Sequence, residues 1–388
     1  MITVADALER LFALVTPLPT ENVPLLQAAG RVLACPVHAR RDQPPFAASA
    51  MDGYAISAGF TRGETLTVIG EAAAGRGFGG PVGPGQAVRI FTGAPMPDGA
   101  DIVAIQEDVM RHEGKITLGP DVGANNMRPL GADFRQGDMV SAPRRLTPSD
   151  IALLAAMNIP QVPVTRRPIV AIIATGDELV QPGETPGPDQ IIASNSYGLA
   201  ALIRELGAEP RLLPIARDTL ESLAFTLSLA AGADLILTIG GASVGDHDLV
   251  GQAAGIAGME QVFYKVAMRP GKPLMAGRLG TSMMIGLPGN PVSAMVCGHV
   301  FVAPVIRAML GLAAQATPRQ EAVLGGPLPA NGPREHYIRA QRTPQGVVAF
   351  DKQDSSLLSV LSASDCLIVQ PAGDGPHAPG EMVQIIPI

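Results

Sequence analysis

The sequence of 388 residues has no tryptophan and only three cysteines, Cys35, Cys297 and Cys366. These cysteines are far apart and form neither a CxxC pair nor a Cys/His ligand spacing, so neither a zinc site nor a disulfide framework is predicted. The cysteine content is typical of a protein in a reducing compartment. We therefore expect a cytoplasmic protein.

Long apolar runs and an excess of positive charge are also missing. No run of about 18 apolar residues that would span a bilayer is found, and Asp6 and Glu9 within the N-terminal apolar pattern argue against a signal peptide. The 28 basic and 35 acidic residues give a formal net charge of −7. Because this charge is negative, no general attraction to nucleic acid or to anionic membranes is expected, and an anionic substrate must be held by local cations.

The residues that are present indicate a globular protein with several domains. Hydrophobic residues make up 47% of the chain, which is ample for a buried core. The 44 glycines and 36 prolines stay below the quarter of the chain that would indicate disorder, so they mark turns. The length predicts about two to four domains rather than one.

The most informative stretch is DLILTIGGASVGDHD at residues 234–248. Its apolar run from Leu235 to Ile239 predicts a strand that is buried on both faces in the middle of a sheet. Gly240 and Gly241 then permit backbone angles that other residues avoid. The polar residues that follow are Ser243, Asp246 and Asp248. Because ligands bind outside the carboxyl ends of parallel strands, we expect a site here.

From residue 168 the chain alternates between strand-like and helical patterns, which predicts right-handed crossovers and a mostly parallel sheet. The loops after the strands then meet at one edge of the sheet. These loops contain Asp177, Glu178, Asp218, Ser243, Asp246, Asp248 and Asn290. Asp218 has the spacing of a helix cap with Glu221, and Asn290 is expected to cap an apolar helix that runs from Pro291 to about Leu310.

A basic segment, YKVAMRPGKP, carries Lys265, Arg269 and Lys272 around a Pro-Gly turn. A solvated basic loop remains open as an explanation, but the nearby acidic loops favour a site that binds an anion both directly and through a metal. A helix N-terminus contributes only about 0.3 to 1 kcal/mol, too little to hold a multiply charged anion beside several carboxylates. A bridging hard cation such as Mg²⁺ is therefore expected.

The rest of the chain is predicted to form two helices, a small β domain and a C-terminal β-barrel. Thr3 caps the first helix, and the second spans residues 148–157. Residues 45–137 between them carry short β-prone runs with a turn signal about every ten residues. Further β runs from about residue 318 predict the barrel. Its polar residues Arg334, Tyr337 and Arg339 fit either the barrel surface or the site.

Three polar spots stand out in the small β domain. They are Asp52-Gly53, Thr92-Gly93 and Asp133. Taken singly, each is better explained by local structure, as a hairpin turn, a strand end and a solvated loop, because Asp, Asn and Gly favour turns for local reasons.

The run from Gly241 to Gly245 also matches G-x-S-x-G, a pattern of serine hydrolases. The carboxylates of Asp246 and Asp248 directly after Ser243 would repel the charge that develops in an oxyanion hole. A serine nucleophile is therefore disfavoured.

Six segments together resemble the molybdopterin molybdenumtransferase family, in the family's order and over nearly the whole chain. They are PPFAASAMDGYA, RIFTGAPMP, ATGDELV with a downstream SNS, GGASVGDHD, MRPGKP and GLPGNPVSA. The resemblance implies a homodimer of L-shaped subunits with a multidomain α/β fold. The implied domains are an elongated helical and linker domain at 1–44 and 138–166, an inserted small β domain at 45–137, a parallel-sheet molybdopterin-binding domain at 167–317 and a C-terminal β-barrel at 318–388.

The same resemblance implies insertion of molybdenum into adenylylated molybdopterin, with molybdate and Mg²⁺ used and AMP released. It points to Glu178 and Asp248 as catalytic and metal-binding acids, with Asp218 and Asp246 in support. Asp52, Thr92 and Asp133 would complete the site from the partner subunit. The other implied substrate-binding residues are Ser194, Asn195, Gly240, Gly241, Ser243, Lys265, Arg269, Lys272, Pro288, Gly289 and Asn290. Arg269 stands where many relatives have lysine, which argues against a neutral amine at that position.

Two other functions remain open from the sequence. One is a non-catalytic molybdopterin-binding scaffold, and the other is a molybdopterin adenylyltransferase of the preceding step, because the α/β domain alone resembles those enzymes. The presence of the acids and bases argues against a scaffold, and the flanking domains favour insertion. An adenylyltransferase and molybdoenzymes are possible partners.

Overall fold

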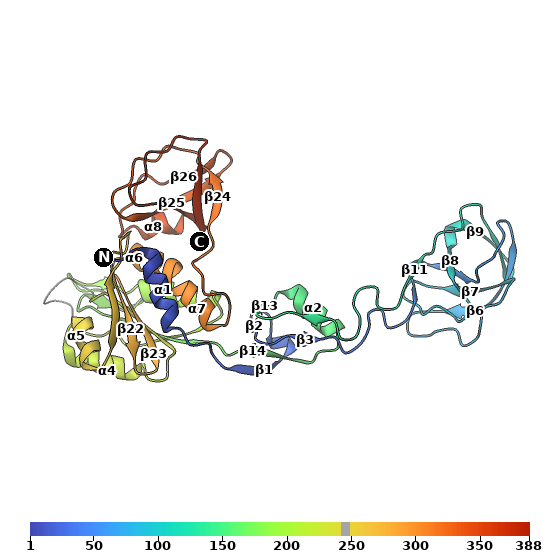
Figure 1. Cartoon of the computed structure of the whole chain (residues 1–388), viewed down its shortest axis with the longest axis horizontal. Coiled ribbons are helices and arrows are strands. Elements are labelled where there is room, and N and C mark those ends of the chain that lie inside the picture. Colours follow the sequence, from blue (N-terminus) through green and yellow to red (C-terminus); the bar gives the residue numbers. More distant parts are fainter. Residues whose placement is uncertain (242–248) are drawn as a thin grey trace. The chain divides into compact units, whose positions relative to one another are not determined.

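The structure is a computed structural model that describes residues 1–241 and 249–388 (Figure 1). The chain forms two compact units. One consists of Met1–Glu21 with Thr165–Ile388, and the other of Asn22–Val164.

The first unit is built on a six-stranded sheet with the strand order β18-β15-β19-β23-β22-β20. Its strands are β15 (Ile169–Ala174), β18 (Glu209–Leu212), β19 (Leu235–Ile239), β20 (Glu260–Lys265), β22 (Pro273–Leu279) and β23 (Ser282–Leu287). The first four strands in this order run parallel. β22 runs antiparallel to β23, and β20 runs antiparallel to β22, so that β22 is the one reversed strand of this sheet. All five residues of β19 are buried, so the predicted central strand and the mostly parallel sheet are confirmed.

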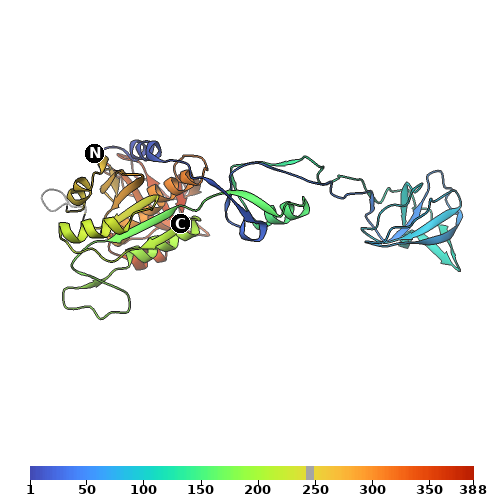
Figure 2. The ribbon, with the colours of Figure 1, turned by 90° about the horizontal axis from the view of Figure 1, so that it is seen from below.

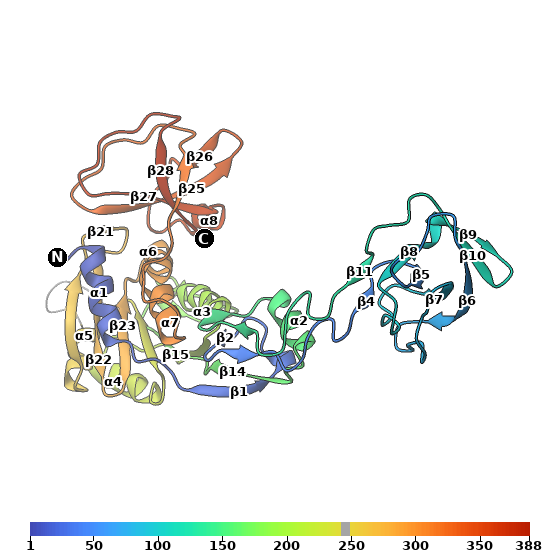
Figure 3. The same cartoon turned by 45° about the vertical axis from the view of Figure 1, so that its right-hand side comes forward.

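Helices cover both faces of this sheet (Figures 2 and 3). On one face, α4 (Leu220–Leu229) and α5 (Leu249–Ile256) share a core with β15 and β19. The helices that pack on the other strands and on one another are α1 (Val4–Leu14), α3 (Asn195–Glu205), α6 (Pro291–Cys297) and α7 (Ala303–Met309). Thr3 caps α1 through a capping box with Asp6, as predicted.

The helical run Pro291–Met309 corrects one expectation from the sequence. It consists of α6, the π-helical turn η3 (Gly298–Val302) and α7. Among the described residues it is the one helix long and apolar enough to cross a membrane by length and composition, although no such run was expected. Because 83% of its apolar window is buried inside the fold, it is accounted for as a core helix.

A second sheet in this unit follows the strand order β21-β25-β27-β28-β24, with β26 paired to β25. Its strands are β21 (Met268–Arg269), β24 (Gln320–Val323), β25 (Glu335–Thr343), β26 (Gly346–Ala349), β27 (Cys366–Gln370) and β28 (Met382–Pro387), accompanied by α8 (Leu358–Ser362). The five C-terminal β runs predicted from the sequence are therefore confirmed. An isolated bridge joins Leu324, directly after β24, to Val347 of β26.

The other unit contains the inserted β structure, a six-stranded sheet with the order β8-β5-β7-β6-β10-β9. Its strands are β5 (Gly53–Ile56), β6 (Thr65–Ala72), β7 (Gln86–Ile90), β8 (Ile102–Ile105), β9 (Val109–His112) and β10 (Lys115–Leu118), with a 3₁₀ turn η2 (Gln106–Asp108). Two apolar clusters of its own lie on this sheet. The predicted β character of the segment is confirmed.

The two helices predicted in residues 1–44 and 138–166 are confirmed as α1 and α2 (Pro148–Ala156). Helix α1 belongs to the first unit, where Leu8 and Leu11 are buried. The rest pairs mainly as short strands around one helix, because brief apolar runs broken by Pro and Gly are too short for helices. These elements are β1 (Thr20–Pro24), η1 (Leu25–Gln27), β2 (Val32–Leu33), β3 (Val37–His38), β12 (Met139–Val140), β13 (Arg144–Arg145), α2 and β14 (Gln161–Thr165). Two further short strands, β4 (Ala48–Ser49) and β11 (Met127–Arg128), pair with each other within residues 45–137.

Candidate functional site

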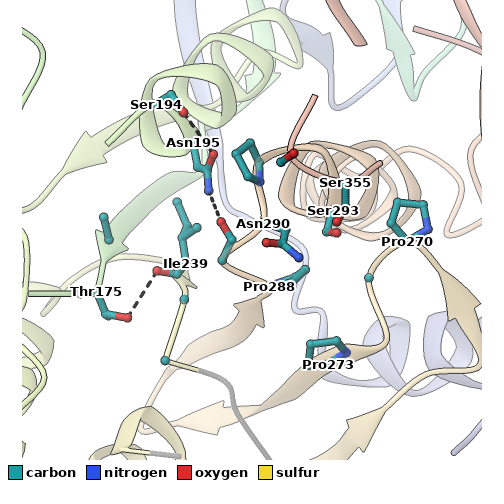
Figure 4. A pocket seen from close by; sticks show the side chains of 18 of the residues that line it. Thr175, Ser194, Asn195, Ile239, Pro270, Pro273, Pro288, Asn290, Ser293 and Ser355 are labelled. Carbon is teal, nitrogen blue, oxygen red and sulfur yellow. Dashed lines mark hydrogen bonds between the residues drawn. The ribbon is translucent and has the colours of Figure 1, made fainter. Parts of the chain in front are cut away.

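A cavity of about 900 Å³ lies at the carboxyl ends of β15, β19 and β23 in the first unit (Figure 4). Loops after all three strands line it, together with the hairpin between β20 and β22 and two segments of the C-terminal sheet. The hairpin reaches this edge because β22 runs antiparallel to β23, so that the start of β22 lies beside the end of β23. The predicted site at this edge of the sheet is thus a real concavity of ligand size.

Gly240 and Gly241 allow the turn after β19 to enter the cavity. Their φ angles are 91° and 64°, values that L-residues with a Cβ rarely adopt. A Cβ on Gly240 would lie 2.9 Å from the Thr175 carbonyl oxygen, and one on Gly241 would lie 2.3 Å from Cγ2 of Val250. Glycine is therefore required at both positions for the backbone to form this wall.

Carboxylates gather on one side of the cavity. Glu178 and Asp218 both line it, and Asp177 accepts a long hydrogen bond of 3.4 Å from the Asp218 amide. Partial burial, then the charges of Asp177 and Glu178, raise the pKa of Asp218 above its ordinary value. The predicted gathering of acids from separate loops is therefore present for Glu178 and Asp218.

Asp218 does not have the capping role expected from the sequence. Thr219 is the N-cap of α4, and its hydroxyl accepts from the Ser222 amide at 3.2 Å. Threonine takes the cap because its extended backbone angles place its side chain over the first turn. The Asp218 carboxylate is thereby left for the cavity.

Replacing Asp218 by asparagine should make the protein slightly more heat-stable at neutral pH. Because the folded pKa of this acid is raised, the ionised carboxylate costs stability as the pH rises from the unfolded value of 3.8 through the folded value. We expect Tm of the variant at pH 7 to exceed that of wild type by about a degree or two, and the difference to vanish below about pH 4. Calorimetry across this pH range tests it, and a clearly lower Tm at pH 7 would contradict it.

The SNS and GNP motifs lie side by side in the wall of the cavity (Figure 4). Ser194 occupies the N-cap position of α3 but makes no side-chain cap bond. Instead, Nδ2 of Asn195 donates to the Gly289 carbonyl oxygen at 2.7 Å. Asn290 is the N-cap of α6, as predicted, and Pro288, Gly289 and Asn290 all line the cavity. The two motifs therefore hold each other in place.

Basic residues line another part of the cavity, its cationic side. Arg269 and Lys272 come from the hairpin, and Arg334 and His336 come from β25 and the residue before it. Arg269 lies beside His336 because β21 pairs in parallel with β25. Lys265 is not part of this lining, and its ammonium lies 5.3 Å from the centre of the Tyr264 ring. Of the three basic residues predicted for the site, Arg269 and Lys272 thus line the cavity and Lys265 does not.

The sequence leaves open whether Arg334, Tyr337 and Arg339 lie on the surface of the C-terminal domain or at the site. Arg334 lines the cavity. Arg339 is 1% exposed and binds two residues of the cavity wall, Gln353 and Asp354. Its Nε and backbone amide donate to Oε1 of Gln353 at 3.1 and 3.0 Å, and Nη1 donates to the Asp354 carbonyl oxygen at 2.7 Å. Tyr337 is buried and hydrogen-bonded to Glu335. The cavity residues that the sequence did not reveal include His336, Gln353, Asp354, Ser355 and Ser356.

Three predicted residues lie in the other unit. Oδ1 of Asp52 accepts hydrogen bonds from the amide and hydroxyl of Thr92, both at 2.8 Å. These bonds, the amide first, lower the pKa of Asp52. Asp52 does not form the hairpin turn that local structure suggested, because Gly53 begins β5, whose partners are β7 and β8. Asp133 lines a separate cavity of about 550 Å³ with Arg128.

Ser243, which is also the serine of the G-x-S-x-G match, lies outside the described residues, as do Asp246 and Asp248. Among the described residues, no group of three His, Cys, Asp or Glu side chains has the arrangement of a metal site. The remaining acids still fit Mg²⁺, a hard cation that takes carboxylate oxygens. Burial first, and then the charges of Asp177 and Glu178, raise the pKa of Asp218, and a bound cation would relieve the repulsion among these carboxylates.

Family models match the chain in three successive regions. They are the MoeA N-terminal region (domain I and II) at residues 2–158, a probable molybdopterin binding domain at residues 171–308 and the MoeA C-terminal region (domain IV) at residues 321–388.

Whole-chain relatives agree with these models. The molybdopterin molybdenumtransferase of Nostoc sp. is 38% identical over 100% of this chain and 94% of its own length. That of Haemophilus influenzae is 34% identical over 96% and 94%. The crystal structure of the molybdopterin biosynthesis MoeA protein from Pyrococcus horikoshii matches with a TM-score of 0.87 and 30% identity over 100% of both chains. The relatives are named as transferases, which confirms the prediction of a transferase. The chain therefore belongs to the molybdopterin molybdenumtransferase family.

Proposed function

We propose that this protein inserts molybdenum into adenylylated molybdopterin in the cytoplasm, using molybdate and Mg²⁺ and releasing AMP. The observation that carries the proposal is a cavity lined both by the carboxylates of Glu178 and Asp218 and by the cations Arg269, Lys272 and Arg334. A cavity of this kind suits a substrate with a phosphate link next to a second oxyanion.

The cationic side is the proposed molybdate site. Arg269 and Arg334 offer planar forks of donors that match a tetrahedral oxyanion, and Lys272 adds a compact charge. Ser293 also lines the cavity and supplies a hydroxyl donor. These residues would present molybdate to the dithiolene sulfurs of the pterin, which is a task of positioning rather than covalent catalysis.

The acidic side is the proposed place of the pyrophosphate link. Glu178 and Asp218, with Asp248 from the loop after β19, would hold Mg²⁺. When bound, this ion polarises the phosphate oxygens and neutralises charge on the departing AMP. The turn at Gly240 and Gly241 would bring backbone close to the substrate, and Asn195 and Asn290 would orient it through their amides.

We further propose that the active protein is a homodimer of four-domain subunits with a closed C-terminal β-barrel. Asp52, Thr92 and Asp133 of the partner subunit would then complete each site. The support is that these residues are polar, that Asp52 and Thr92 are held together by two hydrogen bonds, and that all three lie in a different compact unit from the acidic loops.

The test is incubation of the purified protein with adenylylated molybdopterin, followed by measurement of AMP. Release that needs both molybdate and Mg²⁺, together with formation of molybdenum cofactor, is the expected result. AMP release independent of molybdate would reject insertion. Transfer of AMP from ATP to molybdopterin would instead assign the preceding adenylylation step, and binding without turnover would assign a scaffold.

A further inference from the structure

His336 brings a titratable ring into the cationic side of the cavity. Its backbone pairs in parallel register with Arg269 of β21, and Arg334 lies two residues before it in sequence. All three residues line the cavity. The position paired with His336 on β27 is Gln370, an uncharged side chain whose amide donates to the Pro329 carbonyl oxygen at 2.9 Å.

The surroundings keep this imidazole neutral in the absence of an anion. Burial, followed by the charges of Arg269, Arg339 and Arg334, lowers the pKa of His336 to about 4. Lys272 also lines the cavity, and the carboxylates there belong to Glu178, Asp218 and Asp354. Asp354 already accepts from the amide and hydroxyl of Ser356 at 2.8 and 2.6 Å.

A bound dianion would raise the pKa of His336 again. A single opposite charge within about 4–6 Å moves a pKa by about 1–3 units, and a dianion acts with twice that charge. Such an anion beside Arg269 and Arg334 also offsets the guanidinium charges that disfavour the imidazolium. The protonated ring has two N–H donors instead of one, so it can add a charge-assisted hydrogen bond to the anion.

We propose that His336 takes up a proton when a tetrahedral dianion binds beside Arg269 and Arg334, so that oxyanion binding is coupled to protonation. This inference rests on the proposed oxyanion site and adds its regulation by pH. The binding constant should therefore fall as the pH rises, by several-fold and at most about tenfold for each unit, because one proton is linked to one anion. Loss of this proton would help to release an anion that has not reacted.

Isothermal titration calorimetry of the full chain with molybdate, and separately with sulfate, tests the coupling. Both probes are dianions at about pH 6, and titration in buffers with different heats of ionisation counts the protons taken up on binding. We expect on the order of half a proton per anion for wild type. His336→Gln should bind more weakly at this pH and take up almost none.

His377→Gln is the matched control. The ring of His377 is already held between Glu381 and Asp374 at 2.7 Å each, in a loop that does not line the cavity, so this variant should take up as many protons as wild type. His336→Asn serves as a second variant if glutamine impairs folding. Binding without proton uptake by wild type, or equal uptake by the His336 variants, overturns the coupling alone. No binding of either anion overturns the proposed oxyanion site as well.

Discussion

Glu178→Gln is expected to lower the rate of AMP release by about 10²- to 10³-fold, the usual cost of removing one preorganised electrostatic partner from a reaction site. The substitution keeps the shape of the side chain and removes its charge. Because Glu178 would share Mg²⁺ with Asp218 and Asp248, the Mg²⁺ concentration for half-maximal activity should also rise. Initial rates measured over a series of Mg²⁺ concentrations separate the two effects.

Stability distinguishes this loss from a structural defect. The charge of Glu178 disfavours the ionised form of Asp218, so the variant should be at least as heat-stable as wild type. Glu184→Gln is the control on the same loop, since its carboxylate accepts from the Gln181 amide at 2.9 Å and does not line the cavity. The control should keep nearly full activity. If Glu178→Gln releases AMP at the wild-type rate, the assignment of the acidic side is wrong.

The part of the site that the sequence predicted correctly depends on topology alone. Once strands and helices alternate, the loops after parallel strands must meet at one edge. This rule brought together Glu178, Asp218 and Asn290 from distant segments, and it needed no side-chain detail. The same rule does not give the conformation of a single residue. For that reason the sequence predicts a helix cap at Asp218, whereas Thr219 provides it.

The cationic side was predicted less well because it depends on pairing between distant strands. The sequence alone does not distinguish Lys265, the last residue of β20, from Lys272 in the following turn. In the structure only Lys272 lines the cavity. The contribution of β25 follows from its pairing with the two-residue strand β21, for which the sequence has no periodic signal. The two-residue strands β2, β3, β12 and β13 cannot be predicted from the sequence for a related reason, since they are too short to show a period.

Gly271→Ala is the second substitution with a large expected effect, although it adds only one methyl group. Gly271 has a φ of +105°, and its Cβ would lie 2.5 Å from Sγ of Cys297. That thiol is fully buried in α6, so the turn rather than the helix must move. The left-handed conformation alone costs about 1–2 kcal/mol for a residue with a Cβ. A shift of about 1 Å in Arg269 and Lys272 should lower activity about 10²-fold.

Cys297→Ala in the same chain tests this explanation, because it removes the sulfur that the new methyl group meets. The double variant should regain part of the lost activity and heat stability, while the cost of the backbone angle remains, and a double-mutant cycle measures the coupling. Gly255→Ala is the matched control: this helical glycine of α5 has no atom within 4 Å of the added Cβ, so alanine should be neutral or slightly stabilising. Additive effects of the changes at 271 and 297 would show that the turn is not held against α6 by this contact, and that the position of the two cations depends on the backbone angle of Gly271 alone.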